Sequence, residues 1–147
     1  MNKFDDIQKL ISESESFVEF ADFGDGISDE WIEKAESRLG FSLPDSYKWW
    51  LKNYSGGEIY GEEIYSIYEE DFDTVVGGDI VYMHELNQRN NHFPENVFVI
   101  CEADDEVYYF DISVQEDGNE YPIYSYNAKR KYAVDFIDFL NKRITEN

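Results

Sequence analysis

Residues 28–57, SDEWIEKAESRLGFSLPDSYKWWLKNYSGG, carry the signals that decide the fold. Ser28 is a residue type that caps helix N-termini, and the two acids that follow it favour the positive end of a helix dipole. Apolar side chains then recur at helical spacing at Trp31, Ile32, Ala35 and Leu39. Gly40 is the expected C-terminal stop, so the pattern predicts a helix over about 29–39.

A second helix follows after a short connection. Pro44 suits the first helical position, because the N–H group that proline lacks would have no partner there. The apolar stripe of this helix is Tyr47, Trp50, Leu51 and Tyr54, and the glycines at 56 and 57 end it. Because Gly40 stops one helix and Pro44 starts the next, this segment predicts a fixed helix–helix corner.

The flanking sequence supplies the remaining elements. A helix is predicted over about 3–13, and Gly24 and Gly26 mark a loop after it. Aromatic and β-branched runs predict strands at 58–60, 63–68, 97–103, 107–112 and 122–126. A helical pattern covers 78–90, the Asp104-Asp105 pair predicts a tight turn, and a helical stripe runs from about Tyr132 onward. This order predicts a single α+β domain over residues 1–147, with helices packed on a mainly antiparallel sheet.

The charge of the chain excludes two classes of partner. The sequence has 33 Asp and Glu against 12 Lys and Arg, a formal net charge of −21. Binding to nucleic acid phosphates or to anionic membranes needs clustered basic side chains instead. The excess is concentrated in residues 53–128, which hold 18 acids and one base. Because 42% of the residues are hydrophobic and 18% aromatic, we expect an acidic globular protein rather than a disordered tail.

The sequence also bears on the compartment. Cys101 is the single cysteine and lies in an apolar run, so it reads as a buried residue of a protein in a reducing environment. Asp5 and Asp6 stand where a signal peptide has its apolar stretch, and no apolar run approaches the length of a membrane span. We therefore expect a cytoplasmic protein.

Candidate catalytic and metal-binding patterns are weak. His84 and His92, eight residues apart, match no metal-ligand or base–nucleophile spacing, and the acidic runs at 69–73 and 102–106 do not fit a calcium-binding loop. We expect no metal, no cofactor and no enzymatic activity. A hydrolase that uses two carboxylates stays open, since their separation cannot be read from sequence. Trp31 and Trp50 are expected in the core, whereas Trp49 is a candidate exposed binding anchor.

The 28–57 stretch resembles the signature of the SUKH superfamily, which includes yeast cell-wall assembly regulators and bacterial immunity proteins. The matching residues are Ile32, Glu36, Leu39, Gly40, Leu43, Pro44, Asp45, Tyr47, Leu51, Tyr54, Ser55, Gly56 and Gly57. The paired strands and last helix are also similar, although Asp104-Asp105 stands where the family often has glycine. The resemblance implies that bacterial members of this kind usually neutralise a toxin, often a nuclease domain, by binding it.

These observations predict an immunity protein, or antitoxin, that binds the basic nuclease domain of a polymorphic toxin through acidic surface complementarity. The alternative is a non-enzymatic regulatory scaffold of the cell-wall regulator type. The residues expected at the toxin interface are acids of the middle segment with nearby tyrosines as hot spots. They are Tyr60, Glu62, Glu63, Tyr65, Tyr68, Glu69, Glu70, Asp71, Asp73, Asp104, Asp105 and Glu106.

Overall fold

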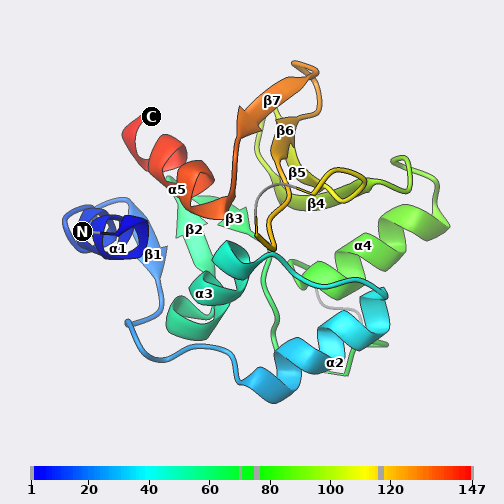
Figure 1. Cartoon of the computed structure of the whole chain (residues 1–147), viewed down its shortest axis with the longest axis horizontal. Helices are drawn as coiled ribbons and strands as arrows, with labels where there is room; N and C mark the ends of the chain where they lie inside the picture. The colour runs from blue at the N-terminus through cyan, green and yellow to red at the C-terminus, as the bar shows by residue number, and fades with distance from the viewer. Residues whose placement is uncertain (1, 70, 75–76, 116–117, 147) are drawn as a thin grey trace.

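Helices gather on one side of a single sheet in a computed structural model that describes residues 2–69, 71–74, 77–115 and 118–146 (Figure 1). Within these ranges the helices are α1 (Lys3–Ser12), α2 (Asp29–Leu39), α3 (Asp45–Tyr54), α4 (Ile80–Arg89) and α5 (Phe136–Thr145). The strands are β1 (Val18–Phe20), β2 (Gly57–Ile59), β3 (Glu62–Ile64), β4 (Val97–Glu102), β5 (Val107–Asp111), β6 (Ile123–Ser125) and β7 (Arg130–Ala133).

Each strand pairs with the next one along the chain, and every pair is antiparallel. The sheet order is therefore β1-β2-β3-β4-β5-β6-β7. One parallel bridge, between Ser66 and Asp79, lies outside the strands. The expected α+β class with a mainly antiparallel sheet is confirmed.

The core lies between the sheet and the helices. Phe98 of β4 contacts Phe41 and His84, and Phe110 of β5 contacts Tyr47 of α3 and Phe136 of α5. All of these except Phe41 and His84 are fully buried, with exposed fractions of 0%. Since alternate residues of a strand point to opposite sides, the neighbours of Phe98 and Phe110 in their strands face away from the helices.

The 28–57 stretch folds as its sequence predicts. The Ser28 hydroxyl accepts a hydrogen bond from the Trp31 N–H at 3.4 Å, and Gly40 ends α2 with a left-handed φ of 87°. The Glu36 carboxylate then accepts a hydrogen bond from the Leu43 N–H at 2.7 Å, which fixes the corner into α3. One detail is wrong: Pro44 is the N-cap residue, and α3 begins one residue later.

Several predicted boundaries at the ends of the chain and of the sheet are wrong. The sequence predicts neither β1 nor β7, and the last helix begins at Phe136 because Tyr132 and Ala133 belong to β7. Both strands lie at the edges of the sheet: β1 has only three residues, too few to show a strand period, and β7 begins with the basic residues Arg130 and Lys131. Pairing with a neighbouring strand decides their conformation. The predicted 63–68 strand is also shorter. The Tyr65 N–H still bonds to the Ile100 carbonyl oxygen at 2.7 Å, and from Ser66 the chain pairs with the segment at Gly78 and Asp79 instead of with β4.

Candidate functional site

The side of the sheet away from the helices carries an aromatic cluster over β5 and β6. Tyr109 stacks on Tyr124 with ring centroids 5.9 Å apart and meets the edge of Tyr126 at 6.0 Å. Phe93, from the segment before β4, packs on Tyr126 at 4.9 Å. These four rings are half-buried and pack mainly on one another. This side, which we call the open side, is therefore a surface of partly accessible aromatic rings.

A row of three glutamates crosses the other half of the open side. Glu19 of β1 lies opposite Glu58 of β2, and Glu58 lies opposite Glu63 of β3. Opposed side chains on neighbouring strands have Cβ atoms about 5 Å apart, and like charges in such pairs repel. A hydrogen bond shared with Glu19 raises the pKa of Glu58, with smaller contributions from burial and from repulsion by Glu19 and Glu63. We call these residues the glutamate row.

Two glycines hold the row in place. A Cβ atom on Gly57 would lie 2.1 Å from the Glu19 carbonyl oxygen, so only glycine lets β1 approach β2 this closely. Gly78, with φ of 92°, passes beside Glu63, whose carboxylate oxygens would lie 2.6–2.7 Å from a Cβ there. The signature glycine at 57 thus has a geometric role that its sequence position alone does not reveal.

Two of the expected interface residues, Glu62 and Tyr65, do not offer an accessible side chain on the open side. Glu62 and Glu63 are adjacent in β3 and point to opposite sides, and Glu62 forms an ion pair with Arg143 of α5. Tyr65 is only 7% exposed, and its carbonyl oxygen accepts a hydrogen bond from the Tyr47 hydroxyl at 2.5 Å. Tyr65 is therefore not the accessible hot spot that we expect, because its ring is buried and its hydroxyl group hydrogen bonds to Glu102 at the end of β4.

The other expected residues near β3 are accessible. Tyr60 is 43% exposed and stacks on Phe17 with centroids 4.2 Å apart, and Tyr68 is 39% exposed and donates a hydrogen bond from its hydroxyl to Glu63. These two tyrosines stand beside the glutamate row.

The acids that follow Tyr68 belong to a different part of the surface. Glu69 and Asp71 are exposed, while Asp73 accepts a hydrogen bond from Arg38 of α2 at 2.7 Å. Glu70 lies outside the described residues. The position of Asp73 against α2 shows that the loop after Tyr68 leaves the sheet.

The β4–β5 turn is acidic, as expected, but its three acids differ. Asp104 and Asp105 are exposed at the tip, where the N–H of Ala103 bonds to the Glu106 carbonyl at 2.8 Å. Partial burial raises the pKa of Glu106, yet bonds from the Asn127, Val107 and Ala128 N–H groups outweigh burial and lower it. Glu106 therefore ties this turn to the β6–β7 turn, and the expected residues do not form one continuous patch.

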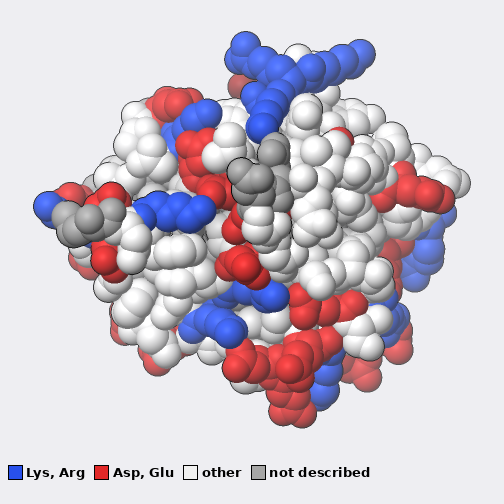
Figure 2. Space-filling model, viewed as in Figure 1, with Lys and Arg blue, Asp and Glu red and all other residues white. Residues whose placement is uncertain are grey.

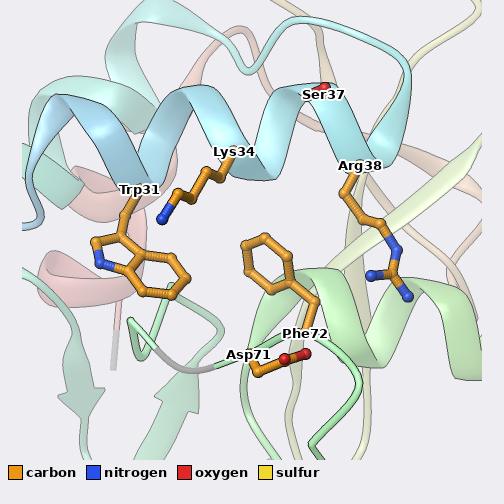
Figure 3. Close-up of a pocket in the computed structure, with 6 residues that line it drawn as sticks. All are labelled: Trp31, Lys34, Ser37, Arg38, Asp71 and Phe72. Carbon is orange, nitrogen blue, oxygen red and sulfur yellow. The ribbon is translucent and has the colours of Figure 1, made fainter.

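A groove of about 590 Å³ opens between α2 and the segment at 71–72 (Figure 3). Its lining residues are Trp31, Lys34, Ser37, Arg38, Asp71 and Phe72. Trp31 meets Phe72 edge to face at 5.7 Å, and the Lys34 ammonium lies 4.5 Å from the Trp31 ring centroid. Trp31 is thus half-buried in a groove wall instead of in the core, whereas Trp50 is fully buried as expected. Trp49 is half-buried between Phe4 and Tyr54.

The formal charge is unevenly distributed. Figure 2 shows Lys and Arg gathered over the β6–β7 hairpin at the top of the view, and Asp and Glu gathered along the lower edge over α2. The hairpin residues Lys129, Arg130 and Lys131 are all exposed. The basic β6–β7 hairpin and the glutamate row of β1–β3 therefore lie at opposite ends of the sheet.

The reactive side chains lie in apolar surroundings. His84 packs between Phe41 and Phe98, and burial lowers its pKa. Within the described ranges, no group of three or more His, Cys, Asp or Glu side chains has a geometry that could hold a metal ion.

Cys101 is expected to resist modification in the folded protein. It is 1% exposed, and burial raises the pKa of its thiol to about 12, so the reactive thiolate is scarce near neutral pH. Iodoacetamide at about pH 8 should leave native Cys101 intact and alkylate it fully in concentrated guanidinium chloride, as mass spectrometry would show. Rapid alkylation of the native protein would contradict the buried position.

None of the helices in the described ranges is both long and apolar enough to cross a bilayer.

A SUKH family model described as SMI1-KNR4 cell-wall matches residues 29–140. The match begins with α2, ends within α5 and includes strands β2 to β7. Strand β1, which contributes Glu19, precedes the matched range.

Proposed function

Because the chain belongs to the SMI1-KNR4 family of the SUKH superfamily, we propose that it is a cytoplasmic immunity protein that neutralises a toxin. The toxin carries a basic nuclease domain, and the immunity protein binds that domain through the open side of its sheet. The observation that carries the proposal is the acidic half of this side, where the glutamate row lies beside the exposed Tyr60 and Tyr68.

The charges explain how such binding would inhibit a nuclease. A nuclease domain must present positive charge to the phosphates of its substrate. An acidic protein surface can bind to the same positive side chains and so keep the nucleic acid away from them. Complementary charge speeds association by about 10- to 1,000-fold, while buried aromatic side chains supply much of the affinity and specificity. Tyr60 and Tyr68 are suited to that second role, because both are exposed and the Tyr68 hydroxyl donates to Glu63.

The proposal is tested by co-expression with the C-terminal nuclease domain of a toxin encoded immediately upstream. The chain should restore growth to cells that express this domain, and the two proteins should elute together in gel filtration. Cells that express the toxin domain with an empty vector serve as the control. Failure of both rescue and co-elution would overturn the proposal, and the regulatory scaffold would then be the better account.

A further inference from the structure

The aromatic cluster on the open side lies between two turns of opposite charge. Tyr109 of β5 and Tyr124 of β6 stack at its centre. The β4–β5 turn at one flank carries the exposed Asp104 and Asp105, and the β6–β7 turn at the other flank carries the exposed Lys129. One surface therefore combines partly accessible aromatic rings with an anionic border and a cationic border.

The two turns are held side by side at one end of the sheet. Glu106, which follows the acidic pair, accepts hydrogen bonds from the Asn127 N–H at 2.7 Å and the Ala128 N–H at 3.1 Å in the β6–β7 turn. The Asn127 side-chain amide also donates to the Asp105 carbonyl oxygen at 3.3 Å. These bonds fix the two turns relative to each other before any partner arrives, and such pre-organisation lowers the ordering cost of binding.

A second cation lies on the same side of the sheet as the rings. Lys131 of β7 stands opposite Tyr124 of β6 in the sheet register, and residues opposed in this way share one face of the sheet. The Lys131 side chain is exposed. The cationic border therefore consists of Lys129 at the turn and Lys131 in the strand.

The order of the strands makes this surface complementary to itself. Because β4 to β7 are consecutive antiparallel strands, the β4–β5 and β6–β7 turns lie one strand spacing to either side of the line between β5 and β6. A two-fold axis along this line exchanges the positions of the two turns. It places the acidic turn of each copy over the cationic turn of the other, and it brings the aromatic clusters together on the axis.

We infer that two copies of this chain associate through the aromatic cluster, with Asp104 and Asp105 of each copy facing Lys129 and Lys131 of the other. Sheets that pack face to face keep their strands within about 30° of one another and lie about 10 Å apart, a space that aromatic rings from both copies fill. Strands β1–β3 lie beyond β4 and stay uncovered in this arrangement. The dimer therefore goes beyond the proposed function and leaves the glutamate row accessible.

The net charge of −21 on each copy opposes this association at long range. At about 0.15 M salt the Debye length is about 8 Å, so salt screens the repulsion between remote acids, while opposite charges in contact still attract. The test is therefore made near this ionic strength.

Sedimentation equilibrium at about 150 mM NaCl measures the mass of the protein in solution. The wild type should approach twice the mass of one chain as its concentration rises to about 300 µM. D104K/D105K should weaken the dimer about tenfold or more, although it lowers the net charge, because it sets cations against Lys129 and Lys131. E13K/E15K makes the same charge change at exposed positions outside β4–β7, and it should alter the dimer constant less than about twofold.

A mixture of charge-reversed variants identifies the contact itself. K129E/K131E should also weaken the dimer, and mixing it with D104K/D105K should restore association, since one symmetric contact is then unchanged and the other has its charges exchanged. A mixture as monomeric as its components would overturn the inference, as would a monomeric wild type at about 300 µM. Equal effects of D104K/D105K and E13K/E15K would overturn it too, and this comparison decides the matter even if K129E/K131E fails to fold.

Discussion

Replacement of Gly26 by alanine is expected to lower the free energy of unfolding by about 3 kcal/mol. A Cβ atom at this position would lie 1.7 Å from the Lys52 carbonyl oxygen and 2.6 Å from the Asn53 nitrogen. Both are backbone atoms of α3, so the overlap cannot be relieved by a change of rotamer. The segment at 24–27 must then move away from the helix.

The movement would also break hydrogen bonds. The Gly24 and Ile27 N–H groups donate to the carbonyl oxygens of Asn53 and Leu51, each at 2.8 Å, and so satisfy acceptors at the C-terminus of α3. Because the same segment links β1 to α2, its displacement should disturb the position of Glu19 as well.

Chemical denaturation monitored by tryptophan fluorescence measures the effect. Gly77→Ala is the matched control, since Gly77 has no left-handed φ and a Cβ there meets open space. Its stability should change by less than about 0.5 kcal/mol. Equal stability of the two alanine variants would show that the 24–27 segment does not pack on α3 as described.

Replacement of Ser46 by alanine is expected to destabilise the fold by about 2–3 kcal/mol near neutral pH. The buried Ser46 hydroxyl donates to Glu120 at 2.7 Å and accepts from the Phe136 N–H at 3.0 Å. Removal of this hydroxyl leaves the buried Phe136 N–H without a partner. The buried Glu120 carboxylate also loses one of its two hydrogen bonds from Ser46 and keeps only the bond from the Ser46 N–H, at 2.9 Å.

The loss should depend on pH. Burial raises the pKa of Glu120, and the bonds from Ser46 oppose that rise. The variant should therefore have a still higher Glu120 pKa in the folded state, so its deficit shrinks as pH falls from 7 towards the unfolded value near 4.3. The exposed Ser42→Ala is the control. A deficit that is the same at both pH values would contradict the role of the Ser46 hydroxyl.

Local signals were enough to predict α2, α3 and the corner between them. The Ser28 cap, the Gly40 stop and the apolar stripes act within a few residues, and the structure contains each of them. Strands β1 and β7 depend instead on their neighbours, since β1 has three residues and β7 begins with two basic ones. Segments this short are too small for a strand period to be distinguished from a loop.

The candidate site was predictable in its chemistry and only partly in its residues. Sequence places the acid excess in residues 53–128, and Glu63, Tyr60 and Tyr68 do lie on or beside the open side. Glu19 and Glu58 were missed because only the register of β1 on β2 brings them together. Sequence does not show which side of a short strand faces the helices, so it cannot exclude Glu62, and it does not reveal the burial of the Tyr65 ring.

The claim that charge on the open side draws in a basic toxin domain is tested most directly by the association rate constant of the two proteins. Stopped-flow fluorescence would measure this constant from about 20 mM to about 300 mM NaCl, for wild type and for E19Q/E58Q/E63Q. The account predicts a fall of about tenfold or more for wild type across this range, and a clearly flatter dependence for the variant. A rate constant for wild type that does not change with salt would contradict it.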